Sequence, residues 1–251
     1  MLSIRGVSKS FGALQALKDV TFEIEKGQIH GVIGPNGSGK TTLFNCISGH
    51  LRPEAGSIQL AGRALTGLKP HDIANLGVRR TFQAGKVVNS LTVLENVMAG
   101  VFDWRMADYF ETFLRPPGRG SRREQALEQR ARESLAVVGL AGEAERMGAD
   151  LVWAQRQFVQ IARAMVANPQ VLLLDEPNSG MGARDTERIE EVIRGLRGSG
   201  ITVVVISHDV KMLMGLSDWV TVLNFGRTIA AGKPEAVQKD PKVLEAYLGA
   251  E

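Results

Sequence analysis

Gly34-Pro35-Asn36-Gly37-Ser38-Gly39-Lys40-Thr41-Thr42 is the stretch of this sequence that decides the fold. It fits the pattern G-x-x-x-x-G-K-[ST], in which a glycine-rich loop surrounds phosphate with backbone N–H groups. The apolar run Ile29–Ile33 precedes it and predicts a buried strand, and apolar residues follow it at helical spacing. A loop that joins a strand to a helix in this way directs its amides and the positive end of the helix dipole at one anion. The stretch therefore predicts a binding site for a nucleoside triphosphate.

Each part of this loop has an expected role. Lys40 is expected to reach the β- and γ-phosphates, and the Thr41 hydroxyl is expected to ligate Mg²⁺. The plainer alternative is a glycine-rich turn that carries a solvated lysine. The candidate nucleotide contacts in the loop are Gly34, Pro35, Asn36, Gly37, Ser38, Gly39, Lys40, Thr41 and Thr42.

Composition sets limits on the class of protein. The 251 residues are 44% hydrophobic, enough for one large core or two modest ones. The formal net charge of +3 is too small to predict a nucleic-acid partner, and we expect none. The longest apolar run, 201–206, is too short to cross a bilayer, and the N-terminus lacks the apolar core of a signal peptide. With the single Cys46 excluding an internal disulfide, we expect a soluble protein of a reducing, cytoplasmic compartment.

Hydrophobic patterns divide the chain into three parts. The first sixty residues favour strands, at 2–7, 20–25 and 57–60. From about Ser90 to Asn168 helical spacing dominates, interrupted at Arg115-Pro116-Pro117-Gly118. Strands at 171–174, 201–206, 219–223 and 228–231 then alternate with helical segments such as 185–196. This order predicts an α/β fold with a mostly parallel sheet, helices on both faces and a helical insertion.

One basic cluster stands out within the helical part. Six arginines lie between Arg115 and Arg132, against only Glu124 and Glu128. The cluster suits an acidic partner or anionic lipid, but a solvated helix face is the favoured interpretation.

A second segment points to the same chemistry as the loop. The apolar strand at 171–174 leads into Asp175 and Glu176, which places two carboxylates at the edge of the sheet where the phosphate loop also ends. Asp175 is expected to hold Mg²⁺ directly or through water, and Glu176 to polarise the water that attacks the γ-phosphate. Alone, a strand followed by Asp-Glu-Pro is usually a turn; together with the loop it predicts nucleotide hydrolysis.

Two further side chains complete the candidate catalytic set. His208 follows the strand at 201–206, where the strand order predicts a position beside the acidic pair. Gln83 ends a predicted strand before the helical part, and it is expected to contact the attacking water or Mg²⁺. The alternatives are a structural histidine and an ordinary surface amide.

The phosphate loop, Gln83, the acidic strand and His208 stand in an order and spacing that resemble the nucleotide-binding subunit of ABC transporters. The resemblance covers essentially the whole chain. It implies a P-loop NTPase core with an N-terminal antiparallel β subdomain, formed by residues 1–89 and 160–251, and a helical subdomain over 90–159. It also implies that Phe11 stacks on the adenine ring of ATP, the alternative being a core phenylalanine on a strand.

Finer features resemble the subgroup that powers importers of branched-chain amino acids. They are Arg80-Thr81-Phe82-Gln83, Leu91-Thr92-Val93-Leu94-Glu95-Asn96-Val97, the Arg115-Pro116-Pro117 insertion, Val222-Leu223-Asn224-Phe225-Gly226, and the ending from Asp240-Pro241 to Glu245-Ala246-Tyr247-Leu248. The resemblance implies a subunit on the inner face of the plasma membrane that docks on membrane permeases. It also implies a dimer with a sibling ATPase or with a second copy, and a periplasmic binding protein that delivers the substrate.

One segment departs from the family pattern. The family closes ATP with a signature loop, Leu-Ser-Gly-Gly-Gln, of the opposite subunit, and the matching segment here is Leu151-Val152-Trp153-Ala154-Gln155. Val152 lacks the hydroxyl that donates to the γ-phosphate, and Ala154 adds a methyl group where glycine admits phosphate. Gly182 also stands where the family usually has Asp or Asn. We therefore expect unequal ATP sites in a heterodimer, with the site closed by Val152, Ala154 and Gln155 hydrolysing poorly.

Three functions remain open from the sequence. The leading one is an import motor that hydrolyses ATP. The second is a soluble ATPase that acts on nucleic acid or ribosomes, although such forms usually carry two of these domains or a long coiled-coil insertion. The third is a subunit that binds ATP with weak turnover. The cargo is equally open, because urea and short-chain amide importers have very similar ATPases.

Overall fold

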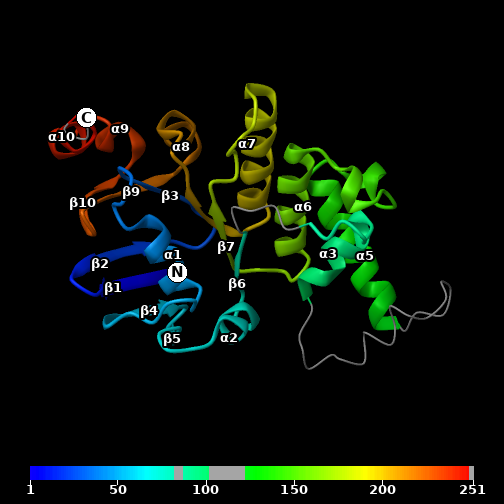
Figure 1. The fold of residues 1–251 in the computed structure, drawn as a ribbon, viewed down its shortest axis with the longest axis horizontal. Helices are drawn as coiled ribbons and strands as arrows, with labels where there is room; N and C mark the ends of the chain where they lie inside the picture. The colour runs from blue at the N-terminus through cyan, green and yellow to red at the C-terminus, as the bar shows by residue number, and fades with distance from the viewer. Residues whose placement is uncertain (82–86, 102–121, 249–251) are drawn as a thin grey trace.

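A six-stranded sheet runs through the middle of the computed structural model, which describes residues 1–81, 87–101 and 122–248 (Figure 1). The strand order is β10-β9-β3-β8-β7-β6, and all neighbours are parallel except the β9–β10 pair. Its strands are β3 (Ile29–Ile33), β6 (Val78–Arg80), β7 (Val171–Asp175), β8 (Thr202–Ile206), β9 (Trp219–Asn224) and β10 (Arg227–Gly232).

A second, antiparallel sheet packs beside the first. Its order is β2-β1-β4-β5. Its strands are β1 (Leu2–Phe11), β2 (Leu14–Ile24), β4 (Ala55–Leu60) and β5 (Arg63–Ala64).

Helices cover both faces of the six-stranded sheet. They are α1 (Lys40–Ile47), α2 (Pro70–Asn75), α3 (Val93–Met98), α5 (Arg122–Val137), α6 (Trp153–Met165), α7 (Ala183–Gly198), α8 (Val210–Leu216), α9 (Pro234–Val237) and α10 (Pro241–Leu248), with 3₁₀ turns at Ala99–Val101, Ala141–Glu143 and Gly148–Asp150. None of the helices in the described part of the chain combines the length and apolarity needed to span a bilayer.

Side-chain alternation along the buried strands creates two cores. On β7, Val171 and Leu173 point into the core that contains α1 and the antiparallel sheet, whereas Leu172 and Leu174 point into the core that contains α7 and α8. Because successive side chains of a strand lie on opposite faces, a wholly apolar strand must be covered on both sides. Helix α1 is consequently held between the two sheets, which fixes the phosphate loop that precedes it.

Helices α3, α5 and α6 pack together at one end of the molecule, next to α7 (Figure 1). A capping box begins α3, in which Thr92 Oγ1 accepts from Glu95 N (3.1 Å) and Glu95 Oε2 accepts from Thr92 N (2.7 Å). The buried side chains of this helical group belong to the same core as α7. The predicted boundary at 159/160 lies inside α6, so this helix spans both predicted parts.

The predicted fold class is confirmed: a mostly parallel sheet is flanked by helices, with an antiparallel sheet from the N-terminal residues. Several predicted bounds were wrong; strand β1, for example, ends at Phe11 instead of residue 7. Strand β2 begins at Leu14 instead of residue 20, because its first half lies at a sheet edge and carries exposed side chains. The strand expected to end at Gln83 ends at Arg80 as β6.

Candidate functional site

The loop between β3 and α1 has a path that only glycine allows at Gly34. Its φ of 152° lies in the left-handed range, and an added Cβ would lie 2.0 Å from the carbonyl oxygen of Leu223. Helix α1 then begins without a side-chain cap on its first turn and without an acidic residue there. Its first N–H groups are therefore available to an anion, as a phosphate site requires.

Lys40 folds back along this loop. Its Nζ donates to the carbonyl oxygens of Gly34 (2.7 Å) and Pro35 (2.9 Å), with Ser38 Oγ at 3.4 Å. Burial lowers the pKa of Lys40, and the negative charges of Glu176 and Asp175 oppose that shift. Both predicted carboxylates therefore attract the Lys40 ammonium electrostatically, although they lie more than a hundred residues away in the sequence.

The acidic pair ends β7. Asp175 is the last residue of the strand, and its side chain is 2% exposed. Glu176 has a φ of 48°, a conformation that costs a non-glycine residue about 1–3 kcal/mol. Its N–H donates to Ile206 O (2.8 Å) on β8, which holds the turn in place. The backbone therefore leaves the sheet sharply at the predicted general base.

His208 lies next to Glu176, because β8 is the neighbour of β7. Its Nδ1 is 3.4 Å from Glu176 Oε2, and 65% of the side chain is exposed. The residue before it is buried: Ser207 Oγ donates to Asn178 Oδ1 (2.9 Å), on the loop that follows Glu176. That bond ties the two strand ends together and sets the spacing of the histidine and the carboxylate.

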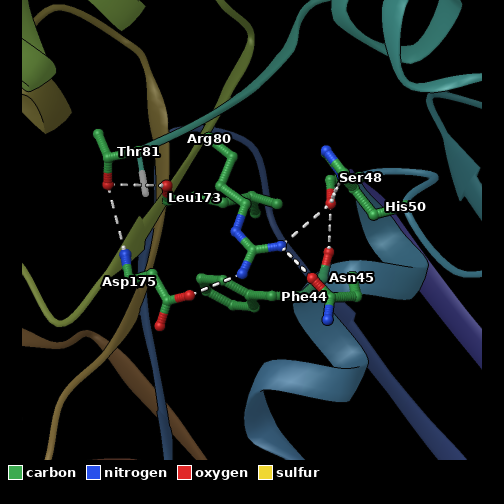
Figure 2. Close-up of polar contacts among 8 residues, drawn as sticks. All are labelled: Phe44, Asn45, Ser48, His50, Arg80, Thr81, Leu173 and Asp175. Carbon is green, nitrogen blue, oxygen red and sulfur yellow. Dashed lines mark hydrogen bonds and ion pairs between the residues drawn. The ribbon is translucent and has the colours of Figure 1, made fainter. Parts of the chain in front are cut away.

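Asp175 has a partner that sequence reasoning did not identify. Arg80, the last residue of β6, donates from Nη2 to Asp175 Oδ2 (2.7 Å), and both side chains are nearly inaccessible (Figure 2). Within the described residues, the other oxygen, Oδ1, is buried and has no hydrogen-bond partner. Mg²⁺ prefers oxygen ligands such as a carboxylate oxygen that has no hydrogen-bond partner, so the residues fit a magnesium site.

Phe11 stands at the end of β1 with 47% of its surface exposed, so the alternative of a core phenylalanine is wrong. Lys9 Nζ lies 5.6 Å from the centroid of its ring. The exposed ring agrees with a stacking surface, and its contact with adenine stays a prediction.

The turn between β9 and β10 also supports the phosphate loop. Gly226 N donates to Ser38 O (3.1 Å), and Gly226 O accepts from Lys18 N (2.7 Å) on β2. Tyr247 of α10 also lies beside the phosphate loop. Burial raises the pKa of its hydroxyl, and a hydrogen bond from the Gly34 backbone opposes that rise. The C-terminal segment, noted in the sequence only as a subgroup feature, thus contacts the loop.

Val152, Ala154 and Gln155 lie at the start of α6, away from these groups. In the described part of the chain no hydrogen bond or ion pair joins them to the phosphate loop, and their place at a second subunit stays a prediction. Val152 is 62% exposed, and its N–H is capped by Gln155 Oε1 (3.2 Å). Beside it, Trp153 Nε1 donates to Ser179 O (2.8 Å) on the loop after the acidic pair.

The structure therefore brings Lys40, Asp175, Glu176 and His208 to one edge of the six-stranded sheet. Thr41 and Thr42 lie in the first turn of α1, with Thr41 exposed and Thr42 half-buried. Gln83 lies outside the described residues, and its role stays a prediction.

Comparison with known proteins agrees with this geometry. Residues 17–179 match the family model described as ABC transporter, and residues 227–251 match the one described as branched-chain amino acid ATP-binding cassette transporter. The sequence is 38% identical over 250 residues to the high-affinity branched-chain amino acid transport ATP-binding protein LivG of Salmonella typhimurium, covering 99% of this chain and 98% of that protein. It is 36% identical, with the same coverage, to BraF of Pseudomonas aeruginosa, which bears the same description.

Solved structures show the same architecture. The ADP conformation of MJ1267, an ATP-binding cassette of an ABC transporter, superposes with a TM-score of 0.86 at 29% identity, covering 99% of this chain and 98% of that one. A dimeric post-hydrolysis state of the cassette MJ0796, bound to ADP and Pi, gives a TM-score of 0.75 at 27% identity, covering 93% and 99%.

Proposed function

This chain belongs to the ABC transporter family of ATP-binding proteins, and on that premise we propose that it is the subunit that binds and hydrolyses ATP in an importer of branched-chain amino acids. The observation that carries the catalytic part is that parallel strands β3 and β7, on either side of β8, end at the same edge of the sheet. This edge holds Lys40 in the uncapped first turn of α1 and the carboxylates of Asp175 and Glu176. The full-length similarity to LivG and BraF supports the cargo.

ATP is proposed to lie with its phosphates along residues 34–42 and its adenine on Phe11. The amides of the loop and the first turn of α1 bind the phosphate oxygens, and Lys40 exchanges its bonds with the loop carbonyls for bonds with phosphate. Thr41, Asp175 and the predicted ligand Gln83 would hold Mg²⁺. When bound, this ion neutralises negative charge that develops on the phosphate oxygens.

We propose that Glu176 accepts a proton from a water molecule as the water oxygen bonds to the γ-phosphorus; the bond from that phosphorus to the bridging oxygen of ADP breaks, and ADP and phosphate leave. Its turn at positive φ directs the residue away from the strand, and the bond from Glu176 N to Ile206 O keeps it there. His208, at 3.4 Å, orients that carboxylate or contacts the γ-phosphate. The opposite nucleotide of the dimer is closed by Val152, Ala154 and Gln155.

The partners and the location follow from the proposed role. The chain would pair with a sibling ATPase or with itself, and this dimer would dock on permease subunits at the inner face of the plasma membrane. A periplasmic binding protein would supply the amino acid. In such an assembly the permeases and the binding protein would contact the cargo, so the choice between branched-chain amino acids and urea or short amides would belong to these partners.

The test is a reconstitution of the chain with its permeases, sibling ATPase and binding protein in proteoliposomes. Leucine, isoleucine or valine should stimulate ATP hydrolysis and appear inside the vesicles, and Lys40→Ala should remove most of both. Stimulation by urea alone would reject the cargo but keep the motor. Failure of the chain to bind Mg-ATP at all would reject the motor itself.

The sequence at the start of α6 favours a second possibility, a subunit with weak hydrolysis. Val152 presents no hydroxyl, and its exposed methyl groups cannot donate to a γ-phosphate. A stoichiometric burst of product without steady turnover would support this alternative.

A further inference from the structure

Arg80 connects three elements that surround the proposed nucleotide. It ends the edge strand β6, which pairs in parallel with β7 through Arg80 and Leu173. Its Nη2 donates to Asp175 Oδ2 (2.7 Å) at the end of β7. Its Nη1 donates to Asn45 Oδ1 (2.6 Å) and lies 3.3 Å from Ser48 Oγ, both at the far end of helix α1 (Figure 2).

The chemistry of the side chain suits this bridging position. The planar guanidinium sits above the ring of Phe44, 5.6 Å from its centroid, and presents one nitrogen to β7 and the other to α1. A lysine ammonium is a single point charge and cannot hold both directions with fixed geometry. The arginine thus sets where the strand end stands relative to the helix that follows the phosphate loop.

The bridge engages only one oxygen of Asp175. Oδ2 is bonded to Arg80, whereas Oδ1 is buried and has no partner among the described residues. The backbone of the same residue is held as well, because Asp175 N donates to Thr81 Oγ1 (3.4 Å), next to Arg80 in the chain. The carboxylate is therefore fixed in orientation, and its Oδ1 has no hydrogen-bond partner among the described residues.

We propose that Arg80 is a positioning residue of the magnesium site: it holds Asp175 through Oδ2, so that Oδ1 is the oxygen that takes up Mg²⁺, directly or through water. This inference rests on the proposed function, because it requires Mg-ATP at this edge of the sheet.

The experiment compares nucleotide affinity with and without metal in the full-length chain. A non-hydrolysable ATP analogue is titrated in excess Mg²⁺ and again in EDTA, and the ratio of the two dissociation constants gives the Mg²⁺ enhancement. Arg80→Gln should reduce that enhancement about tenfold or more, as partners of metal ligands do, while the affinity in EDTA stays within about twofold of the wild type. Arg79→Gln is the matched control, since Arg79 is the neighbouring strand residue and donates instead to Gly100 O (3.2 Å).

Arg80→Lys provides the second variant, because it keeps the buried positive charge and should fold even where Arg80→Gln does not. The Mg²⁺ enhancement of Arg80→Lys should lie between that of the wild type and that of Arg80→Gln. An equal fall of affinity in Mg²⁺ and in EDTA would mean a purely structural arginine and would overturn the inference, as would a wild-type enhancement in folded Arg80→Gln or Arg80→Lys. If the wild-type chain binds no nucleotide, the proposed function has failed instead.

Discussion

His208 Nδ1 lies 3.4 Å from Glu176 Oε2, although the two residues follow different strands of the six-stranded sheet. The parallel pairing of β7 with β8 brings both strand ends to the same edge, and the bond between Ser207 and Asn178 sets their spacing. The histidine is mostly exposed while the carboxylate is more covered. The pair therefore presents the proposed base, Glu176, and its neighbour at the surface where the phosphate chain is proposed to lie.

The first prediction concerns this pair in the assembled transporter. Glu176→Gln should lower the ATP turnover of its own site by roughly a hundredfold or more, because a general base contributes about 10²–10⁴ to rate. His208→Ala should lower turnover less, with little change in the apparent affinity for ATP. Steady-state phosphate release measures both. His71→Ala is the control, since His71 is exposed and contacts Asp72 instead; a loss of equal size in that variant would contradict the assignment.

The second prediction concerns the phosphate loop. Gly34→Ala should abolish detectable nucleotide binding or unfold the loop, because its Cβ would lie 2.0 Å from Leu223 O and the backbone holds a positive φ. Gly195→Ala is the matched control in α7, where nothing lies within 4 Å of an added Cβ. It should instead raise the free energy of unfolding by about 0.5–1 kcal/mol. Binding of a fluorescent ATP analogue and urea denaturation separate the two outcomes.

The third prediction concerns the start of α6. Restoring Val152→Ser together with Ala154→Gly should raise the turnover of the complex several-fold, because a hydrogen bond to a charged phosphate is worth roughly 1.5–3 kcal/mol. In a heterodimer whose sibling carries an ordinary signature loop, Lys40→Ala should remove most of the activity. The equivalent lysine change in the sibling should remove less. The reverse order would show that the asymmetry runs the other way.

The fourth prediction concerns stability in acid. His30 is buried, stacks on Phe22 and contacts Thr221 Oγ1 through Nε2 (2.9 Å), and burial lowers its pKa to about 3. The unfolded chain takes up this proton near pH 6.5 while the folded chain does not, so the stabilisation is present above pH 6.5 and is lost as the pH falls toward 3. Within that window His30 should lower the free energy of unfolding by about 1.4 kcal/mol for each unit by which the pH falls. Urea denaturation of wild type and His30→Gln at several pH values measures it; an unchanged slope in the variant would refute the assignment.

The parts of the fold that could be predicted are those in which local pattern and burial agree. Strand β3 was predicted at Ile29–Ile33 and observed there, since a parallel strand buried on both faces is mostly apolar, here with His30 as its one polar side chain. The first half of β2 was missed. It lies at a sheet edge and its pairing with β1 shifts register repeatedly, so its side chains do not alternate cleanly.

The candidate site likewise has parts that could be predicted from the sequence and parts that could not. The phosphate loop and the acidic strand are contiguous motifs, so residue type and spacing were sufficient to propose them. The bond between Arg80 and Asp175 joins residues 95 positions apart, and it depends on β6 lying next to β7. No local pattern carries that adjacency, and the Arg80-Thr81 run served only as a family feature.

The indole N–H of Trp153 donates a hydrogen bond that joins the helical group to the loop that follows Glu176. An indole whose N–H is so engaged changes its fluorescence when that bond breaks or its surroundings become wetter. In a background of Trp104→Phe and Trp219→Phe, the remaining tryptophan is a native optical probe of the contact between α6 and this loop. A change at this contact when nucleotide is added would thereby be readable without a chemical label.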